Sequence, residues 1–102
     1  MKSKRSKACD IPKKVKDAVW ERDGGRCIIC GSHNAMPNSH YIRRSRGGLG
    51  VEQNIVTMCQ RCHMMYDQGI DGKAIGEYTE KYLRSKYPDW NPDKLIYKKW
   101  ED

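Results

Sequence analysis

Two Cys-x-x-Cys pairs, Cys27/Cys30 and Cys59/Cys62, constrain the possible folds of this chain more than any other feature. Zinc binds four thiolates in a tetrahedron, and two such pairs at the ends of one segment can supply them. The chain has 102 residues, 37% of them hydrophobic and none of them Phe, so its core is small and gains from a metal that holds it together. The sequence therefore predicts a single small domain with a structural Zn2+ site.

Two other interpretations of the cysteines fit less well. The stretch from Cys59 to His63 matches the Cys-x-x-Cys-His motif of c-type haem attachment. Haem attachment needs an oxidising compartment, and it leaves Cys27 and Cys30 unexplained. A redox-active dithiol is expected among thioredoxin-like alternating strands and helices, and neither pair has such surroundings. Cys9 is an unpaired thiol outside the metal pattern.

The positive charge gathers near the N-terminus. Of the formal net charge of +7, residues 1–16 contribute +6 and residues 72–102 contribute +1. Four thiolates on one zinc dication would lower the total to about +5. A basic segment suits nucleic-acid phosphates, although a solvated tail that only aids solubility has the same composition. We expect residues 1–10 to form a flexible basic arm, and Lys13 and Lys14 just beyond it to contact nucleic acid.

The hydrophobic pattern predicts short elements in the order helix, strand, strand, helix, helix, helix. The expected ranges are 12–23 for the first helix, 36–42 and 54–58 for two strands joined by an Arg- and Gly-rich loop, 60–68 for a helix capped by Gly69, 73–86 for a longer helix, and a short last helix from residue 91. These elements indicate a small α+β domain over residues 11–102, with a core at about 22–68 and a C-terminal helical extension at about 72–102.

The sequence has features that bear on secretion and membrane insertion. Residues 1–7 are charged rather than apolar, unlike a secretory leader, and no apolar run is long enough for a membrane-spanning helix. We therefore expect a soluble, cytoplasmic protein with no membrane partner.

Four short segments stand out between the first and last cysteine pairs and just beyond. They are Ser39-His40-Tyr41-Ile42, Gly47-Gly48-Leu49-Gly50, Glu52-Gln53-Asn54-Ile55 and Cys59-Gln60-Arg61-Cys62-His63. Together they resemble the HNH endonuclease family, most closely its small phage-encoded members with two zinc-binding cysteine pairs. The resemblance implies a ββα-metal finger with flanking N- and C-terminal helices, and hydrolysis of DNA phosphodiester bonds to 5′-phosphate and 3′-hydroxyl ends. It also implies phage origin, and hence the cytoplasm of the host.

The resemblance implies a role for three residues. His40 is the implied general base, since a histidine pKa of about 6.5 suits removal of a proton from water near neutral pH. Asn54 is implied to hold the loop and to orient the base. His63 is implied to bind a single catalytic divalent cation, one of Mg2+, Mn2+, Ni2+ or Zn2+.

The chain departs from the family pattern at Ser39, where many relatives carry Asp or His as a second metal ligand. A serine hydroxyl is a weak, neutral ligand, so another group is needed to hold the ion. Asp67 is the candidate, because it lies four residues after His63 and so on the same helical face. The alternative for Asp67 is a solvated carboxylate at the end of the helix.

DNA is the expected partner. Arg43, Arg44 and Arg46 follow the proposed base within one loop, where guanidinium groups can clamp phosphates, although a purely solubilising role is the alternative. We also consider a homodimer, which could cut both strands of a duplex, and proteins of phage packaging or recombination as partners.

Three hypotheses follow for the function. The leading one is a zinc-stabilised, metal-dependent HNH endonuclease acting on DNA. The second is a nucleic-acid-binding zinc module with little or no catalysis, which the serine before the base would favour. The third is a zinc-bearing module that binds a protein of phage packaging or recombination machinery.

Overall fold

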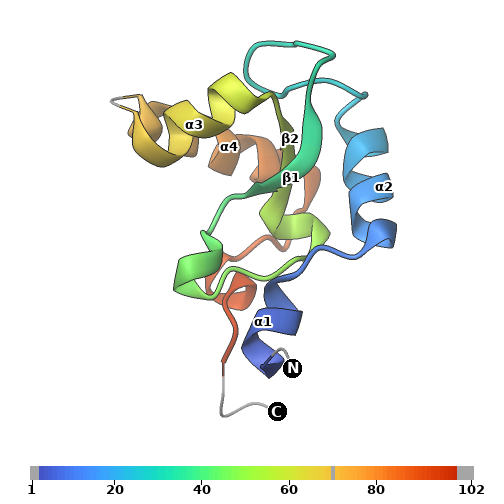
Figure 1. Cartoon of the computed structure of the whole chain (residues 1–102), viewed down its shortest axis with the longest axis vertical. Coiled ribbons are helices and arrows are strands. Elements are labelled where there is room, and N and C mark those ends of the chain that lie inside the picture. Colours follow the sequence, from blue (N-terminus) through green and yellow to red (C-terminus); the bar gives the residue numbers. More distant parts are fainter. Residues whose placement is uncertain (1–2, 70, 99–102) are drawn as a thin grey trace.

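The computed structural model describes residues 3–69 and 71–98 (Figure 1). Its elements follow one another as α1 (Lys4–Cys9), α2 (Lys13–Arg22), β1 (Met36–His40), β2 (Ile55–Met58), α3 (Gln60–Gln68) and α4 (Gly72–Lys86), with short 3-10 turns η1 (Arg44–Arg46), η2 (Glu52–Asn54) and η3 (Pro92–Leu95). This is the predicted small α+β arrangement of a two-stranded hairpin with helices. Residues 99–102 of the predicted C-terminal extension lie outside the described residues.

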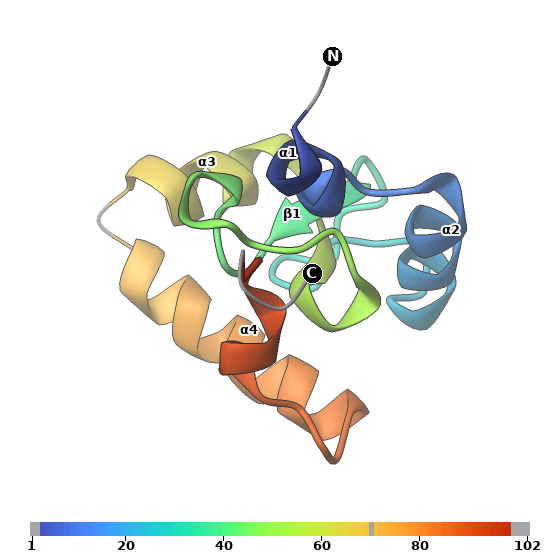
Figure 2. The same ribbon diagram turned by 90° about the horizontal axis from the view of Figure 1, so that it is seen from below.

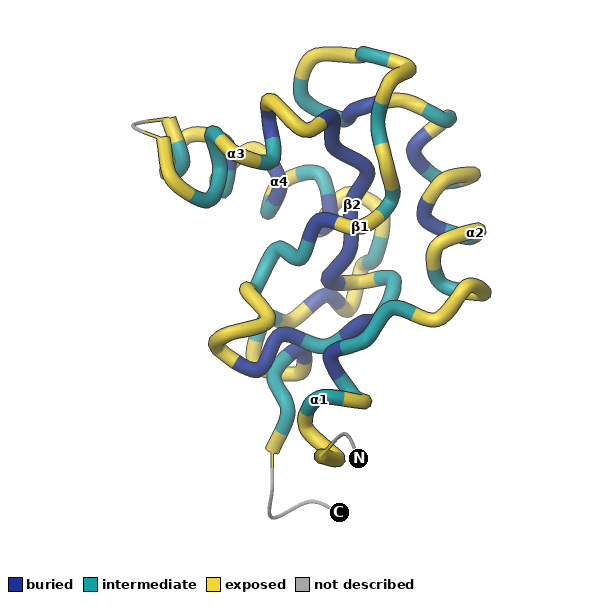
Figure 3. The backbone as a smooth tube through the Cα atoms, viewed as in Figure 1, coloured by how far each residue is buried: buried dark blue, intermediate teal, exposed yellow. Residues whose placement is uncertain are grey.

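The two strands form an antiparallel hairpin that positions the later elements. Ser39 pairs with Val56 and His40 with Ile55, and a register shift precedes Ser39 in β1. Such a bulge bends a strand and re-aims its side chains. All four residues of β2 are buried, as the dark tube in Figure 3 shows. α2 lies on one side of the hairpin and α3 and α4 on the other (Figure 1), and Ser39 of β1 contacts His63 of α3.

The hydrophobic core lies between β2, α4 and the C-terminal turn. Ile75 and Leu83 lie on one face of α4 and join Val56 in a single buried cluster. Tyr41 and Trp90 pack edge to face beside it, with their ring centroids 5.5 Å apart. None of the described helices is both long and apolar enough to cross a membrane.

A charged pair at the end of α2 ties this helix to the hairpin and to α4. Arg22 donates to the carbonyl oxygen of Ile55 at 2.7 Å, and its Nε lies 2.7 Å from the carboxylate of Asp23. The same carboxylate accepts from the backbone N–H of Thr57 at 2.8 Å and from the hydroxyl of Tyr82 at 2.6 Å. Burial lowers the pKa of Arg22, but the hydrogen bonds to Asp23 and Tyr87 and the charge of Asp23 together outweigh burial, and the pKa is raised. A cation held in this way fixes three elements relative to one another.

Most of the segment predicted as a flexible basic arm over residues 1–10 forms a short helix. Residues 4–9 form α1, whose first turn is capped by Ser3, since the Ser3 hydroxyl accepts from the N–H of Ser6 at 3.1 Å. Cys9 is only 1% exposed and anchors the end of this helix in the protein. One buried residue among charged neighbours makes no periodic pattern, so composition alone indicated a solvated tail. Residues 1 and 2 lie outside the described residues.

A smaller correction concerns the end of α3. Gly69 follows the helix as predicted, and its N–H bonds to the carbonyl of Met65 at 3.0 Å. Its φ is −92°, however, so Gly69 does not adopt the left-handed conformation of the usual glycine cap.

Candidate active site

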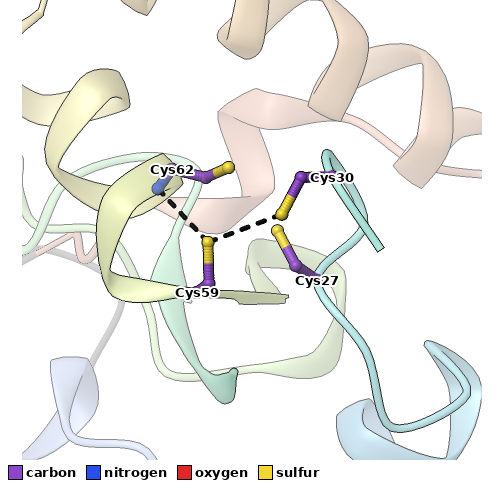
Figure 4. Close-up of side chains that lie close together, drawn as sticks. All are labelled: Cys27, Cys30, Cys59 and Cys62. Atoms are coloured by element: carbon purple, nitrogen blue, oxygen red, sulfur yellow. Dashed lines mark hydrogen bonds between the residues drawn. The ribbon is translucent and has the colours of Figure 1, made fainter. Parts of the chain in front are cut away.

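The four paired cysteines lie together where the turn after α2 meets the start of α3. Cys27 and Cys30 come from the turn after α2, Cys59 caps the start of α3, and Cys62 lies in the first turn of α3 (Figure 4). All four Sγ atoms lie within 4.8 Å of one another, and none of the four forms a disulfide. Four sulfurs bonded at about 2.3 Å to one tetrahedral zinc would lie about 3.8 Å apart. The cluster therefore fits the predicted structural Zn2+ site.

The backbone around the four cysteines favours metal binding through a tight turn and through hydrogen bonds to the sulfurs. Gly31 has a φ of 80°, a left-handed conformation that turns the chain back after the first pair. The N–H of Cys62 points to the sulfur of Cys59 at 3.5 Å. Burial alone would raise the pKa of the Cys27 thiol, but hydrogen bonds from nearby backbone groups lower the pKa to about 7. Because zinc binds thiolates, these hydrogen bonds favour the metal-bound form.

A second group of polar side chains meets where β1 ends beside α3. His40, His63 and Asp67 line one open hollow of about 440 Å3. Five more residues line it, namely Asn38, Arg43, Arg44, Ser45 and Gln68. The predicted base and both predicted ligands of the catalytic cation therefore share one site on the surface.

His63 is held between two partners. Its Nδ1 lies 2.6 Å from the hydroxyl oxygen of Ser39, and its Nε2 lies 3.0 Å from Oδ2 of Asp67. Two ligands at adjacent positions of a six-coordinate ion, each bonded at about 2.1 Å, lie about 3.0 Å apart. Nε2 of His63 and the carboxylate of Asp67 thus fit a shared divalent cation. Ser39 is fully buried, and its hydroxyl orients the His63 ring.

His40 is oriented by the N-terminal segment. Its Nε2 lies 2.9 Å from the carbonyl oxygen of Cys9. A carbonyl can only accept, so Nε2 carries the hydrogen, and the neutral ring keeps a free lone pair on Nδ1. Burial lowers the pKa of His40 below its usual 6.5, while the hydrogen bond to Cys9 opposes the shift and Arg44 adds to it. The ring is therefore mainly neutral at pH 7.

Asn54 holds the loop that follows His40. The Asn54 side chain is completely buried, and its Oδ1 accepts from the N–H of Ile42 at 2.8 Å. Its Nδ2 donates to the carbonyl oxygens of Leu49 at 2.8 Å and Ile42 at 3.2 Å. These hydrogen bonds close the loop from residue 42 to residue 49, which is the loop-holding part of the predicted role. The ring of His40 does not bond to Asn54 but donates to the carbonyl oxygen of Cys9.

Of the three loop arginines, Arg43 and Arg44 line the hollow and Arg46 does not. Arg44 is bound by the N-terminal segment, with its Nη2 2.5 Å from the carboxylate of Asp10. Arg43 lies over the end of α3, where it donates to the carbonyl of Asp67 at 3.1 Å and its Nε lies 3.7 Å from the carboxylate. Arg46 lines an adjoining groove of about 670 Å3, together with Arg43 and Asp67.

The two lysines predicted to contact nucleic acid lie apart from this hollow. Lys13 and Lys14 start α2 and are exposed. Lys13 forms an exposed ion pair with Asp17 at 2.8 Å, and neither lysine lines the hollow. Their contact with nucleic acid stays a prediction.

The sequence analysis missed one polar group that contacts His40, namely the Cys9 carbonyl. Every residue carries a carbonyl, so no residue type marks the one that meets His40. The sequence signal that could have helped is Gly50, where the backbone of Asp10 approaches closely.

Comparisons with known proteins point to one family. A family model described as HNH endonuclease matches residues 27–68, which include both cysteine pairs, His40, Asn54 and His63. A protein named anaredoxin, from a strain of Nostoc, is 33% identical over 58 residues, and the alignment covers 56% of this chain and 76% of that protein. No solved structure matches the chain. α1, α4 and η3 lie outside the residues that the family model matches.

Proposed function

The chain belongs to the HNH endonuclease family, and on that premise we propose that it is a metal-dependent nuclease that hydrolyses phosphodiester bonds of DNA to 5′-phosphate and 3′-hydroxyl ends. The main support for the proposal is that His40, His63 and Asp67 line one open hollow. Phage origin, a homodimer and partners in packaging or recombination stay predictions.

His40 acts as the general base in this proposal. Its Nε2–H is engaged by the Cys9 carbonyl at 2.9 Å, so the lone pair on Nδ1 is available to take a proton from the attacking water. The lowered pKa keeps the ring neutral, and therefore able to accept a proton, at neutral pH. Asn54 keeps the loop after His40 closed, which limits movement of the base.

His63 and Asp67 would hold the catalytic divalent cation through Nε2 and the carboxylate. When bound, such an ion supplies Lewis-acid stabilisation of the phosphate and of the departing 3′ oxygen. Ser39 holds the His63 ring whether or not Nδ1 carries the hydrogen, because a hydroxyl can donate to Nδ1 or accept from Nδ1–H. A buried serine before the base is thus compatible with metal binding and does not by itself favour a non-catalytic module.

The remaining groups hold DNA and the fold. Arg43, Arg44 and Arg46 lie in the loop beside the hollow and would contact phosphates that flank the cleaved bond. The four-cysteine cluster holds the start of α3, and so the position of His63, through structural zinc.

Nicking of supercoiled plasmid tests the proposal. The wild-type protein should nick the plasmid only with an added divalent cation, and His40→Ala should cut about 100- to 10,000-fold more slowly, the usual contribution of a general base. His33→Ala is the matched control, because His33 is exposed and does not line the hollow. If the wild-type protein binds DNA at low salt and no cation supports nicking, the chain is a nucleic-acid-binding module and the nuclease proposal is wrong.

A further inference from the structure

Residues 3–10, which include α1, lie against the loop that joins β1 to β2 (Figure 2), although they precede the residues that the family model matches. Two backbone hydrogen bonds join the segments. The N–H of Gly50 donates to the carbonyl of Ala8 at 3.0 Å, and Nε2 of His40 donates to the carbonyl of Cys9 at 2.9 Å. Consecutive carbonyls at the end of α1 therefore bond to opposite ends of the loop.

Side chains of the N-terminal segment and of the loop also bond to each other. Nη2 of Arg44 bonds to the carboxylate of Asp10 at 2.5 Å and to the carbonyl of Ser6 at 3.1 Å. Arg5 reaches back to the carbonyl of Ser45 at 2.9 Å. These reciprocal contacts, one from each side, fix the position of the α1 backbone over the loop.

Gly50 marks how closely the two segments approach. A Cβ added at Gly50 would lie 1.9 Å from the carbonyl oxygen of Asp10 and 3.1 Å from that of Cys9. The backbone of residues 9 and 10 occupies the space where any other side chain would begin. Only glycine at position 50 therefore allows the segment to reach His40.

We propose that residues 3–10 complete the active site from outside the HNH motif. The carbonyl of Cys9 is the positioning group, which holds His40 with its hydrogen on Nε2 and so leaves Nδ1 as the proton acceptor. When this segment is docked, the base is fixed for catalysis, and when it is displaced, the ring is free to rotate and to exchange tautomers. The tautomer claim depends on the structure alone, whereas its effect on cleavage rests on the proposed nuclease function.

The competing explanation is that the segment serves only as a basic arm that attracts DNA. The two explanations differ in what they predict for kinetics. Loss of positive charge weakens DNA binding and raises KM, whereas loss of a positioned base lowers kcat. The position of the hydrogen on His40 responds to the carbonyl and not to the charge of the arm.

Gly50→Ala is the main test, because it displaces the segment without changing any charge. We expect kcat for plasmid nicking to fall by about 10- to 100-fold, part of the usual contribution of a general base, with KM within about twofold of wild type. Long-range 1H–15N NMR spectra should show His40 as a fixed Nε2–H tautomer in the wild-type protein and as a mixture in Gly50→Ala. Thermal unfolding and zinc content establish that the domain itself remains folded.

Two variants of Cys9 and one of Lys7 guard against a folding defect of Gly50→Ala. Cys9→Lys should expel the segment, because a charged side chain cannot occupy this buried position, and should give the same tautomer mixture. Cys9→Ala keeps a small buried side chain and the carbonyl, and should recover the fixed tautomer. Lys7→Gln, which removes only an exposed charge of α1, should raise KM and leave the tautomer fixed.

The outcomes separate this inference from the nuclease proposal. A wild-type protein with a mixed or Nδ1–H tautomer of His40 would overturn the inference, whether or not it cleaves DNA. So would Gly50→Ala and Cys9→Lys if they change KM alone, as Lys7→Gln does. A fixed Nε2–H tautomer in a protein that no cation makes active would support the positioning of His40 and contradict the nuclease function.

Discussion

His63 and Asp67 lie one helical turn apart on α3, with Nε2 of the ring 3.0 Å from Oδ2 of the carboxylate. The other ring nitrogen is held by the hydroxyl of Ser39 from β1 at 2.6 Å. A hydrogen-bonded ring nitrogen on one side and a carboxylate on the other orient the histidine as metal ligands usually are. In the proposed metal site, Asp67 would supply the acidic ligand that many family members carry before the base.

Asp67→Asn should raise the metal concentration needed for half-maximal cleavage by about 10-fold or more, because a neutral amide replaces an anionic ligand. Rates of plasmid nicking across a Mn2+ titration measure the effect, and saturating metal should restore most of the rate. Asp89→Asn is a suitable control, since Asp89 is exposed and does not line the hollow. An unchanged titration would remove Asp67 from the metal site.

Ser39→Ala should also weaken metal binding, by about 10-fold, since it removes the partner that orients His63. The fold should remain, with one small buried hydroxyl lost. Ser45→Ala changes an exposed serine on the same hollow and should leave the metal requirement as it is. Equal metal affinities for Ser39→Ala and wild type would mean that the ring is held by other contacts.

The pH dependence of cleavage should follow the loss of a proton from His40. The protonated ring cannot act as a base, so the rate at saturating metal should rise with pH and level off above the pKa of His40. Burial lowers this pKa, so the midpoint of the rise should lie below 6.5. A rate profile from pH 5 to 8 measures it, and a midpoint above about 7 would contradict the assignment of the base.

Removal of zinc should unfold the domain. Cys62→Ser, or treatment with a strong chelator, should lower the melting temperature sharply, because the free energy of zinc binding contributes directly to folding. Native mass spectrometry should show one zinc per chain in the wild-type protein. Cys9 lies outside the cluster, so the control variant Cys9→Ser should retain the zinc. A zinc-free protein with an unchanged melting temperature would show that the cluster is not structural.

Much of the fold could be predicted because its signals are local. The spacing of the cysteines indicated the four-cysteine cluster, and the short apolar runs indicated the two strands and α3 to within a few residues. α1 was not predicted, because it depends on the burial of the single residue Cys9 against a distant loop. The bulge before Ser39 also left no mark in the alternation of residues.

The sequence analysis named several residues that line the hollow but could not predict their contacts. The spacing of His63 and Asp67 indicated that they share a helical face, and the structure has them 3.0 Å apart. Spacing could not tell that the Ser39 hydroxyl bonds to His63, or that Arg44 pairs with Asp10, because these contacts depend on how β1, α3 and α1 come together. Backbone partners such as the Cys9 carbonyl are invisible to any search for residue types.

Resealing of the nicked plasmid by DNA ligase tests the central claim most directly. If His40 activates water and the 3′ oxygen departs, the nicks carry 5′-phosphate and 3′-hydroxyl ends, and ligase alone should close them after the protein and metal are removed. Absence of nicks with Mg2+, Mn2+, Ni2+ and Zn2+, or nicks that ligase closes only after treatment of their ends, would contradict the account.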